Sequence, residues 1–388
     1  MTTRSITTEV HPPDATNEPI ARIKHIPWYQ GRLWHGMNLG GWTRLMMRNH
    51  FAVSPSRLPM AVMITFFAAC NTLLAWLEWA LYARDVARTA IDARPVFILG
   101  HWRTGTTLLH ELLAQDPRHT FPTNYASFAA EHFLLTEGVA RRFLWFLLPT
   151  ERPMDRMRMG FDLPQEDEAA LCNLGLPSPF LTVAFPNRSP QDPRYVDLGT
   201  LDEASRRRWE QALAGFLRRV TYRRAGRLVL KSPHNTFRVR WLLKMFPDAR
   251  FVYMVRDPYV LYPSTVHFWK AMYAGHGLQE PNFQGLAEHV LSTFERMHES
   301  FEASRALIPA GHLHELRYED LVAEPLGQLR LLYERLELGD FVPAERAVLR
   351  YLADTREYRT NRYDMSMEER ETIARRWRDY FLRHGYSI

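Results

Sequence analysis

Short apolar runs alternate with longer segments of helical periodicity from about residue 95 onward. Short apolar runs are typical of strands that are buried on both faces of a parallel sheet. Segments in which apolar residues recur every three or four positions predict helices. Such alternation favours right-handed crossovers and an α/β fold with a doubly wound, mainly parallel sheet flanked by helices. The predicted strands are Pro95–Leu99, Leu228–Leu230, Phe251–Val255 and His312–Arg317, and the predicted helices are Phe237–Phe246, Tyr259–Tyr273 and Phe283–Leu307.

The first quarter of the chain departs from this pattern. Residues 1–19 are polar, include Pro12-Pro13 and show no periodicity, which predicts a disordered tail. Residues 20–94 are expected to form a helical extension, because Leu58–Leu77 is a run of twenty residues without a charge. Residues 95–388 then make up the predicted catalytic domain.

The apolar segment Leu58–Leu77 has more than one interpretation. Its length is sufficient to span a bilayer. However, polar residues recur along it at about seven-residue spacing, and alanines form a second stripe. Such a helix could pack on the catalytic domain, form a homodimer or make peripheral membrane contact, and we favour packing or surface attachment over spanning. The polar stripe is Thr65, Asn71, Thr72 and Glu78, and the alanine stripe is Ala61, Ala68 and Ala75.

Composition and charge limit the kinds of ligand that the protein is expected to bind. The 388 residues carry a net charge of +6, which suits a polyanionic small ligand, nucleic acid or an anionic membrane. Nucleic acid is not expected, because the basic residues are scattered over several predicted helices. The two cysteines, Cys70 and Cys172, lack metal-ligand spacing, so we predict no metal site and a reducing compartment. The expected location is cytoplasmic, with membrane association if Leu58–Leu77 contacts a bilayer.

The most informative motif is the loop after the first predicted strand. Pro95–Leu99 leads into a loop bounded by Gly100 and Gly105, and an apolar-periodic helix follows. A strand, a glycine-bounded loop and a helix N-terminus form a phosphate cradle, in which backbone N–H groups face an anion. Arg103 is the fixed cation of this loop.

The same loop disfavours ATP chemistry. Its two glycines have the spacing of an NTP-binding loop, but Thr106 stands where that loop requires lysine. No aspartate-rich strand for magnesium is evident either. A P-loop kinase or NTPase that transfers phosphoryl groups is therefore the less favoured alternative.

Three blocks in this order resemble sulfotransferases that use 3′-phosphoadenosine 5′-phosphosulfate (PAPS). The first is Arg103–Thr107, which is similar to the family's 5′-phosphosulfate loop. The second is Arg256-Asp257-Pro258, followed by Ser264 eight residues after the arginine. The third is Leu316–Pro325 (LRYEDLVAEP). An acidic segment, Glu166-Asp167-Glu168, and a tryptophan-containing C-terminal helix make the bacterial type the nearest resemblance.

The resemblance covers about residues 95–388 and implies a P-loop-type fold. It implies in-line transfer of a sulfuryl group from PAPS to a hydroxyl or amine, without a metal. Lys231, at a strand end, would be a second cation near the leaving oxygen. A catalytically inactive, nucleotide-binding, membrane-associated protein is a further alternative, which the intact cations disfavour. By this resemblance the 5′-phosphosulfate is bound by Arg103, Thr104, Gly105, Thr106 and Thr107, and the 3′-phosphate by Arg256 and Ser264.

The general base has two candidates. His234 follows Lys231 by three residues and has an imidazole suited to proton removal near neutral pH. In the cytosolic branch of the family the histidine follows its lysine by two residues, so the match is imperfect. Glu166 or Glu168 could serve instead, or these acidic residues could only offset the dipole of a helix. We expect His234 to act, with an acid limb of the rate in the histidine range.

The acceptor is not determined by these motifs: a small molecule, lipid or carbohydrate is compatible, and the aromatic content tilts the expectation towards a lipid-like one. The proline-rich segment Pro177–Asp197 predicts either an acceptor-site lid or a plain surface connection. Residues 358–362 could close over the nucleotide. The helix Glu368–His384 is expected to bury Trp377, Tyr380 and Phe381.

Overall fold

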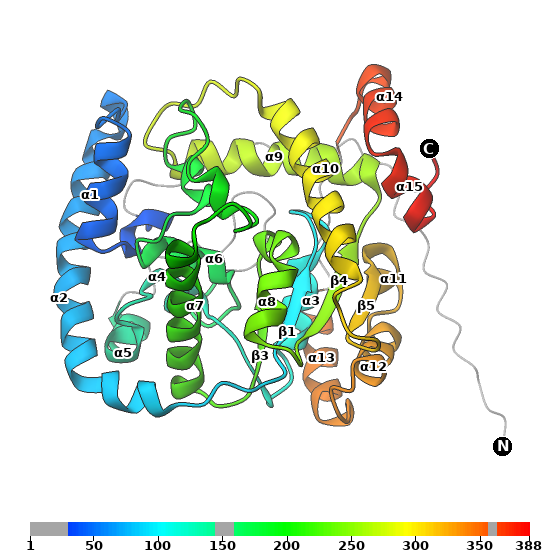
Figure 1. The fold of residues 1–388 in the computed structure, drawn as a ribbon, viewed down its shortest axis with the longest axis horizontal. Coiled ribbons are helices and arrows are strands. Elements are labelled where there is room, and N and C mark those ends of the chain that lie inside the picture. Colours follow the sequence, from blue (N-terminus) through cyan, green and yellow to red (C-terminus); the bar gives the residue numbers. More distant parts are fainter. Residues whose placement is uncertain (1–29, 144–158, 356–362) are drawn as a thin grey trace.

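A computed structural model describes residues 30–143, 159–355 and 363–388. The expectations for residues 1–19 and 358–362 lie outside the described residues. At the centre is a five-stranded sheet of order β2-β3-β1-β4-β5, in which all neighbours are parallel (Figure 1). The strands are β1 (Val96–Leu99), β2 (His119–Thr120), β3 (Arg227–Lys231), β4 (Arg250–Val255) and β5 (Leu313–Arg317).

Helices cover both faces of this sheet, as its apolar runs predicted. Alternate strand residues point to opposite faces, so Phe97 and Phe251 join one core and Ile98 and Val252 join the other. The first core includes α7 (Glu203–Arg223), α8 (Val239–Met245), α9 (Pro258–His276) and α10 (Leu286–Arg305). The second includes α3 (Thr106–Leu113), α11 (Tyr318–Ala323), α12 (Pro325–Arg335) and α13 (Val342–Asp354).

The predicted strands are all present, and two details differ from the expectation. Strand β2 was missed, because its two residues form no apolar run. The predicted C-terminal helix is divided at Trp377 into α14 (Met367–Arg376) and α15 (Arg378–His384). The Trp377 ring stacks on Phe294 with centroids 3.9 Å apart and donates to the Leu291 carbonyl at 3.3 Å, which fixes the break. Trp377, Tyr380 and Phe381 are buried, as expected.

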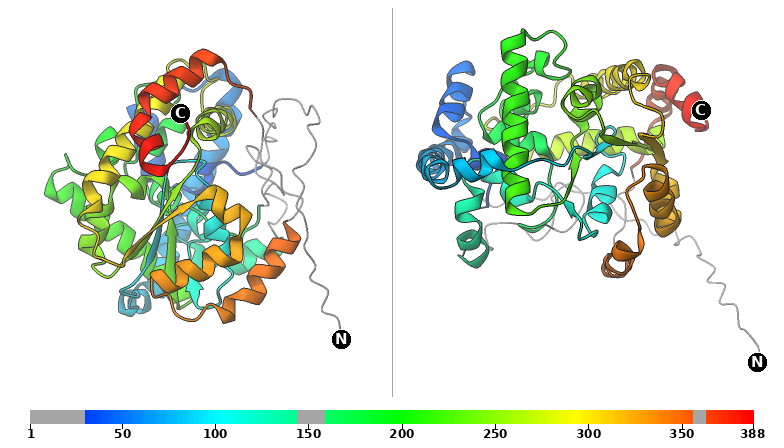
Figure 2. Two further views of the ribbon diagram at one scale, coloured as in Figure 1. Left: turned by 90° about the vertical axis from the view of Figure 1, so that its right-hand side faces the viewer. Right: turned by 60° about the horizontal axis from the view of Figure 1, so that its bottom comes forward.

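The N-terminal part packs along one side of the molecule. It comprises α1 (Leu39–Arg48) and the long α2 (Leu58–Arg88), which lie side by side in Figures 1 and 2. Helix α2 runs beyond the predicted Leu77, because Glu78 turns inward and accepts a hydrogen bond from the Leu135 amide at 3.1 Å. Residues 55–88 are long and apolar enough to cross a membrane, by length and composition alone.

Short elements fill the space between α2 and the sheet. They are η1 (Leu33–Gly36), α4 (Asn124–Phe128), α5 (Phe133–Phe143), α6 (Asp167–Asn173), η4 (Pro179–Val183), η5 (Pro193–Tyr195) and η6 (Pro233–Phe237). The proline-rich segment Pro177–Asp197 is not a plain surface connection, because Phe180, Leu181 and Val183 in it are buried in the main core.

Candidate active site

The carboxyl ends of the central strands meet at one edge of the sheet. Ile98 of β1 pairs with Lys231 at the end of β3, and Leu99 pairs with Tyr253 of β4. Gly100 therefore follows β1 beside Lys231 on one side and beside the residues that lead to Arg256 on the other. Ligands of open α/β sheets bind at this edge.

The loop between β1 and α3 has the backbone shape of an anion cradle. Gly105 has φ +93°, and a Cβ at this position would overlap the ring of Tyr318. Arg103 adopts a left-handed φ of 72°, which costs a residue other than glycine about 1–2 kcal/mol. Such a conformation persists only where the surroundings enforce it and is typical of ligand sites. Helix α3 begins directly after Gly105 without a side-chain cap, so its first amides are directed at the crevice.

Thr104 plays a different part from its neighbours. Its hydroxyl donates to the His101 carbonyl at 2.7 Å, its amide donates to the same oxygen at 3.2 Å, and it is buried. It therefore shapes the loop from within. Of the residues predicted to bind phosphate in this loop, Gly105, Thr106 and Thr107 lie at the helix start, where their amides are the candidates for direct contact.

The two predicted phosphate clamps come together as one cluster. Arg103 Nε donates to Ser264 Oγ at 3.0 Å, and Arg256 Nη1 donates to the Arg103 carbonyl at 2.8 Å. The Arg256 guanidinium lies 4.1 Å from the ring centroid of Tyr318, the same ring that lies over Gly105. Two guanidinium groups and a hydroxyl thus lie together beside a helix N-terminus, and this set of donors suits a ligand with more than one phosphate.

The C-terminal part of the chain holds the Arg256 loop in place. The Arg256 amide donates to Tyr380 Oη at 3.0 Å. Glu319, in the Tyr-Glu-Asp block, accepts from the Asp257 amide at 3.0 Å and from Tyr386 Oη at 2.9 Å. Sequence reasoning missed these supports, because nothing local marks which tyrosine of a C-terminal helix reaches a loop over a hundred residues earlier.

A second cluster lies at the end of β3. Lys231 Nζ donates to Glu166 Oε1 at 2.8 Å, and the side chains are 5% and 17% exposed. Of the acidic segment, Glu166 thus faces the strand ends and meets the predicted second cation.

His234 lies in η6, directly after this lysine. Its ring is 3% exposed and sits edge-on to Trp102 of the β1–α3 loop, with centroids 5.1 Å apart. Burial lowers the pKa of His234 to about 4, although the charge of Glu168 opposes this shift. The imidazole is therefore neutral at pH 7, with a lone pair available. This lowered pKa would move the acid limb expected for His234 below the ordinary histidine range.

Glu168 is unsuited to be a base. Both its oxygens bind the buried guanidinium of Arg238, at 2.5 and 3.2 Å, and one also accepts from Ser178. Burial alone would raise the pKa of Glu168, but Arg238 lowers it to about 2. Asp167 is likewise turned inward, onto the amide of Asn235. These contacts hold α6 against η6 and Arg238, and Glu166 directly precedes this helix.

Aromatic side chains form a wall beside His234 that sequence reasoning did not foresee. The Phe180 ring lies 6.1 Å from His234 and 6.4 Å from both Trp34 and Trp269, and Trp269 lies 5.2 Å from Trp102. These residues come from four separate segments of the chain. Only the fold brings them together.

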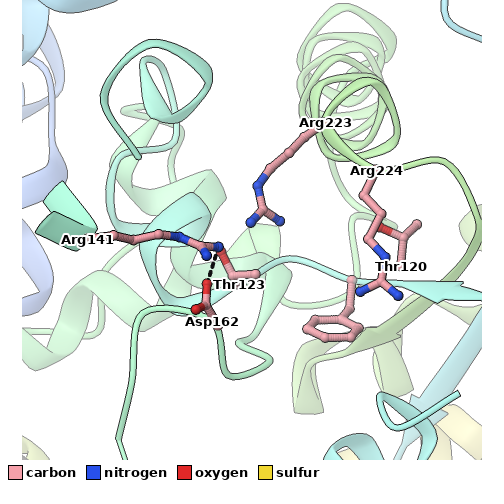
Figure 3. A pocket seen from close by; sticks show the side chains of 7 residues that line it. Thr120, Thr123, Arg141, Asp162, Arg223 and Arg224 are labelled. Carbon is pink, nitrogen blue, oxygen red and sulfur yellow. Dashed lines mark ion pairs between the residues drawn. The ribbon is translucent and has the colours of Figure 1, made fainter. Parts of the chain in front are cut away.

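An open pocket of about 410 Å³ lies beyond β2 (Figure 3). It adjoins the segment that leads to Glu166, because Thr123 pairs with Pro164 and the Gln165 amide donates to the Pro122 carbonyl. None of the predicted donor-binding residues lines it. Its lining is Thr120, Phe121, Thr123, Arg141, Asp162, Arg223 and Arg224, with an ion pair between Arg141 and Asp162.

Solved structures share this architecture. Sulfotransferase STF1 from Mycobacterium tuberculosis H37Rv aligns with a TM-score of 0.62 and 20% identity, over 87% of this chain and 90% of that one. Sulfotransferase STF9 from Mycobacterium avium aligns with a TM-score of 0.64 and 17% identity, over 91% and 98%. At such identities the likeness shows the fold alone.

Relatives found by sequence are informative about the family as well as the fold. The omega-hydroxy-beta-dihydromenaquinone-9 sulfotransferases Stf3 of Mycobacterium bovis and Mycobacterium tuberculosis are each 46% identical over 355 residues, which cover 92% of this chain and 91% of theirs. A sequence profile of the sulfotransferase family matches residues 95–341. These matches exclude the phosphoryl-transferring alternative. The chain belongs to the sulfotransferase family and is an enzyme of sulfuryl transfer.

Proposed function

We propose that this sulfotransferase uses PAPS as its donor and a hydroxyl of a lipid as its acceptor. The main support for PAPS as the donor is that Arg103, Ser264 and Arg256 lie together at the N-terminus of α3, which has no side-chain cap. A PAPS molecule bears a phosphosulfate at one end of its ribose and a phosphate at the other, so it needs two neighbouring anion sites.

The donor-binding residues divide into two groups in this proposal. Arg103 and the amides of Gly105, Thr106 and Thr107 would hold the 5′-phosphosulfate. Arg256 and Ser264 would hold the 3′-phosphate, with Tyr318 stacked beneath the guanidinium. The fit is supported by Gly105, where any larger residue would overlap Tyr318 and close the cradle.

The residues at the end of β3 would serve the transfer itself. PAPS supplies an activated sulfuryl group, whose bond to the nucleotide oxygen breaks as the acceptor oxygen attacks sulfur. Lys231 would face the charge on the leaving oxygen, held in position by Glu166. His234 would accept the acceptor's proton, because its neutral imidazole lies between the donor loop and the aromatic wall.

The acceptor class follows from the aromatic wall and from the relatives. Trp34, Phe180 and Trp269 make the surroundings of His234 aromatic and apolar, and this suits an isoprenoid or other lipid chain better than a sugar. The relatives at 46% identity are named for a hydroxylated menaquinone derivative. We therefore expect a hydroxyl at the end of a prenyl-type chain to be sulfated.

Ligand-dependent thermal unfolding tests the donor. Adenosine 3′,5′-bisphosphate should raise the melting temperature, since ligands that bind the native state stabilise it by mass action. Mg-ATP should raise it little. Equal stabilisation by Mg-ATP would contradict the donor assignment. Mass spectrometry of products from a hydroxylated prenylquinone, a monosaccharide and a simple phenol then tests the acceptor independently.

A further inference from the structure

Helix α2 presents a large apolar face to solvent. Val62 is 70% exposed, Leu73 71% and Trp76 69%, at helical spacings that place them on one side. Monomeric soluble proteins rarely leave a continuous apolar surface of this kind uncovered. Nine of the twenty-three exposed large apolar side chains among the described residues belong to this helix: Leu58, Val62, Phe66, Phe67, Leu73, Trp76, Leu77, Trp79 and Leu81.

Two polar residues in the middle of α2, Asn71 and Glu78, point the other way, into the protein. Asn71 Nδ2 donates to the carbonyls of His35 and Met37, at 2.7 and 3.0 Å, and its Oδ1 contacts His132 at 3.1 Å. Glu78 is buried and accepts from the Leu135 amide. The helix thus buries these two polar side chains among small and apolar ones and leaves large apolar side chains exposed, which is unusual for a surface helix.

These contacts hold α2 against the body along its length. Near its start, Arg57 pairs with Glu280 at 3.1 Å, and towards its end the ring of Tyr82 lies 6.1 Å from Tyr222. A spanning orientation would strip Asn71 and Glu78 of their partners and place them in lipid, which is costly. The outward face is therefore available to a flat surface that runs parallel to the helix.

The chemistry of that face matches a bilayer better than a second copy of the chain. Its tryptophans, Trp76 and Trp79, are bulky and suit the lipid headgroup boundary. The small residues that permit close helix pairing, Ala61 and Ala68, are already buried against the body. Exposed Arg84 and Arg88 follow the apolar stretch with exposed Asp85 between them, so this end of the helix keeps a net positive charge, which favours an anionic lipid surface.

The same helix connects to the proposed acceptor site through contacting rings. Phe67 of α2 lies 5.4 Å from His35 in η1, the next residue back, Trp34, lies 6.4 Å from Phe180, and Phe180 lies 6.1 Å from His234. The helix that carries the exposed face therefore packs against the same layer of rings as the proposed base.

We infer that the outward face of α2 docks the enzyme flat on an anionic lipid bilayer, which would hold it beside a pool of lipid acceptor. The benefit to the reaction rests on the proposed lipid acceptor. The docking itself does not. Partial insertion of the apolar face, with Arg84 and Arg88 among the headgroups, holds the protein without a spanning segment.

Vesicle sedimentation of the full chain tests the docking. The probe is vesicles of equal parts phosphatidylglycerol and phosphatidylcholine, without donor or acceptor. The variant V62E should lower the partition coefficient at least about tenfold, because a charge replaces a side chain that enters the bilayer. The matched control is V342E on α13, where the valine is 66% exposed, and it should bind vesicles like the wild type. Melting temperatures of both variants should match the wild type.

Each outcome of these measurements either supports or overturns membrane docking through α2. Equal vesicle binding by V62E and the wild type, or equal loss in V342E, would overturn the inference. So would a V62E effect on oligomeric state in light scattering without an effect on vesicles, which would identify a second copy as the occupant. Retention of wild type on membranes through alkaline carbonate would identify a spanning helix instead. A failed lipid acceptor with intact vesicle binding would overturn the proposed function and leave the docking standing.

Discussion

Replacement of His234 by alanine tests the proposed general base. The ring is buried beside Trp102, and burial lowers its pKa to about 4, so the neutral form is present at pH 7. Loss of a general base typically costs about 10²–10⁴-fold in rate. We expect kcat to fall within this range in His234→Ala, while the affinity for adenosine 3′,5′-bisphosphate is nearly unchanged, because the donor-binding residues lie on other loops.

The lowered pKa of His234 also determines the pH at which the wild-type rate should decline. At pH 5.5 an imidazole with a pKa of about 4 is about 97% neutral, whereas one at the ordinary value of about 6.5 would be only about 9% neutral. Protonation removes the accepting lone pair, so the rate falls as pH decreases through the pKa. The wild-type rate at pH 5.5 should therefore be close to that at pH 8. A tenfold decline in the rate between pH 8 and pH 5.5 would refute the assignment of a lowered pKa to a His234 base.

The pH profile alone does not identify the base, because carboxylates ordinarily titrate near pH 4 as well. Steady-state kcat of His234→Ala, Glu166→Gln and Glu168→Gln, measured with one acceptor, separates the candidates. Glu168→Gln should mainly lower the melting temperature, since it leaves Arg238 buried and unpaired. Near-normal turnover in His234→Ala, or a collapse confined to Glu166→Gln, would move the role to Glu166.

Two further outcomes follow from single contacts. Arg256→Ala should weaken adenosine 3′,5′-bisphosphate at least about tenfold, the effect of losing a charge-assisted hydrogen bond, and adenosine 5′-monophosphate much less, because only the former has a 3′-phosphate. Equal weakening of both in titration calorimetry would show that Arg256 acts instead through its bond to the Arg103 carbonyl. Burial raises the pKa of Glu78 from 4.5 to about 7, so the folded protein loses stability as pH rises from about 4.5 to 7. Glu78→Gln should therefore raise the melting temperature more at pH 8 than at pH 5, and equal shifts in differential scanning fluorimetry would contradict the raised pKa.

The sequence by itself determined the parts that depend on local pattern. Short apolar runs predicted β1, β3 and β4, because a strand buried on both faces needs apolar side chains throughout. The same pattern puts Gly100, Lys231 and Arg256 at one edge of the sheet, since carboxyl ends of parallel strands lie together. A two-residue strand such as β2 leaves no such signal.

Tertiary structure decided what depends on neighbours that are distant in sequence. His234 has an ordinary sequence context, and its pKa is lowered because the fold buries the ring, with Trp102 and Phe180 among its neighbours. Glu166 and Glu168 are two positions apart in one acidic segment. Glu166 pairs with Lys231 at the strand end, whereas Glu168 forms a buried ion pair with Arg238. The polar and alanine stripes on α2 were visible in the sequence, but the burial of members of both against the body was not. Periodicity gives the angle between two faces of a helix, whereas the partners offered by the rest of the fold decide which face is buried.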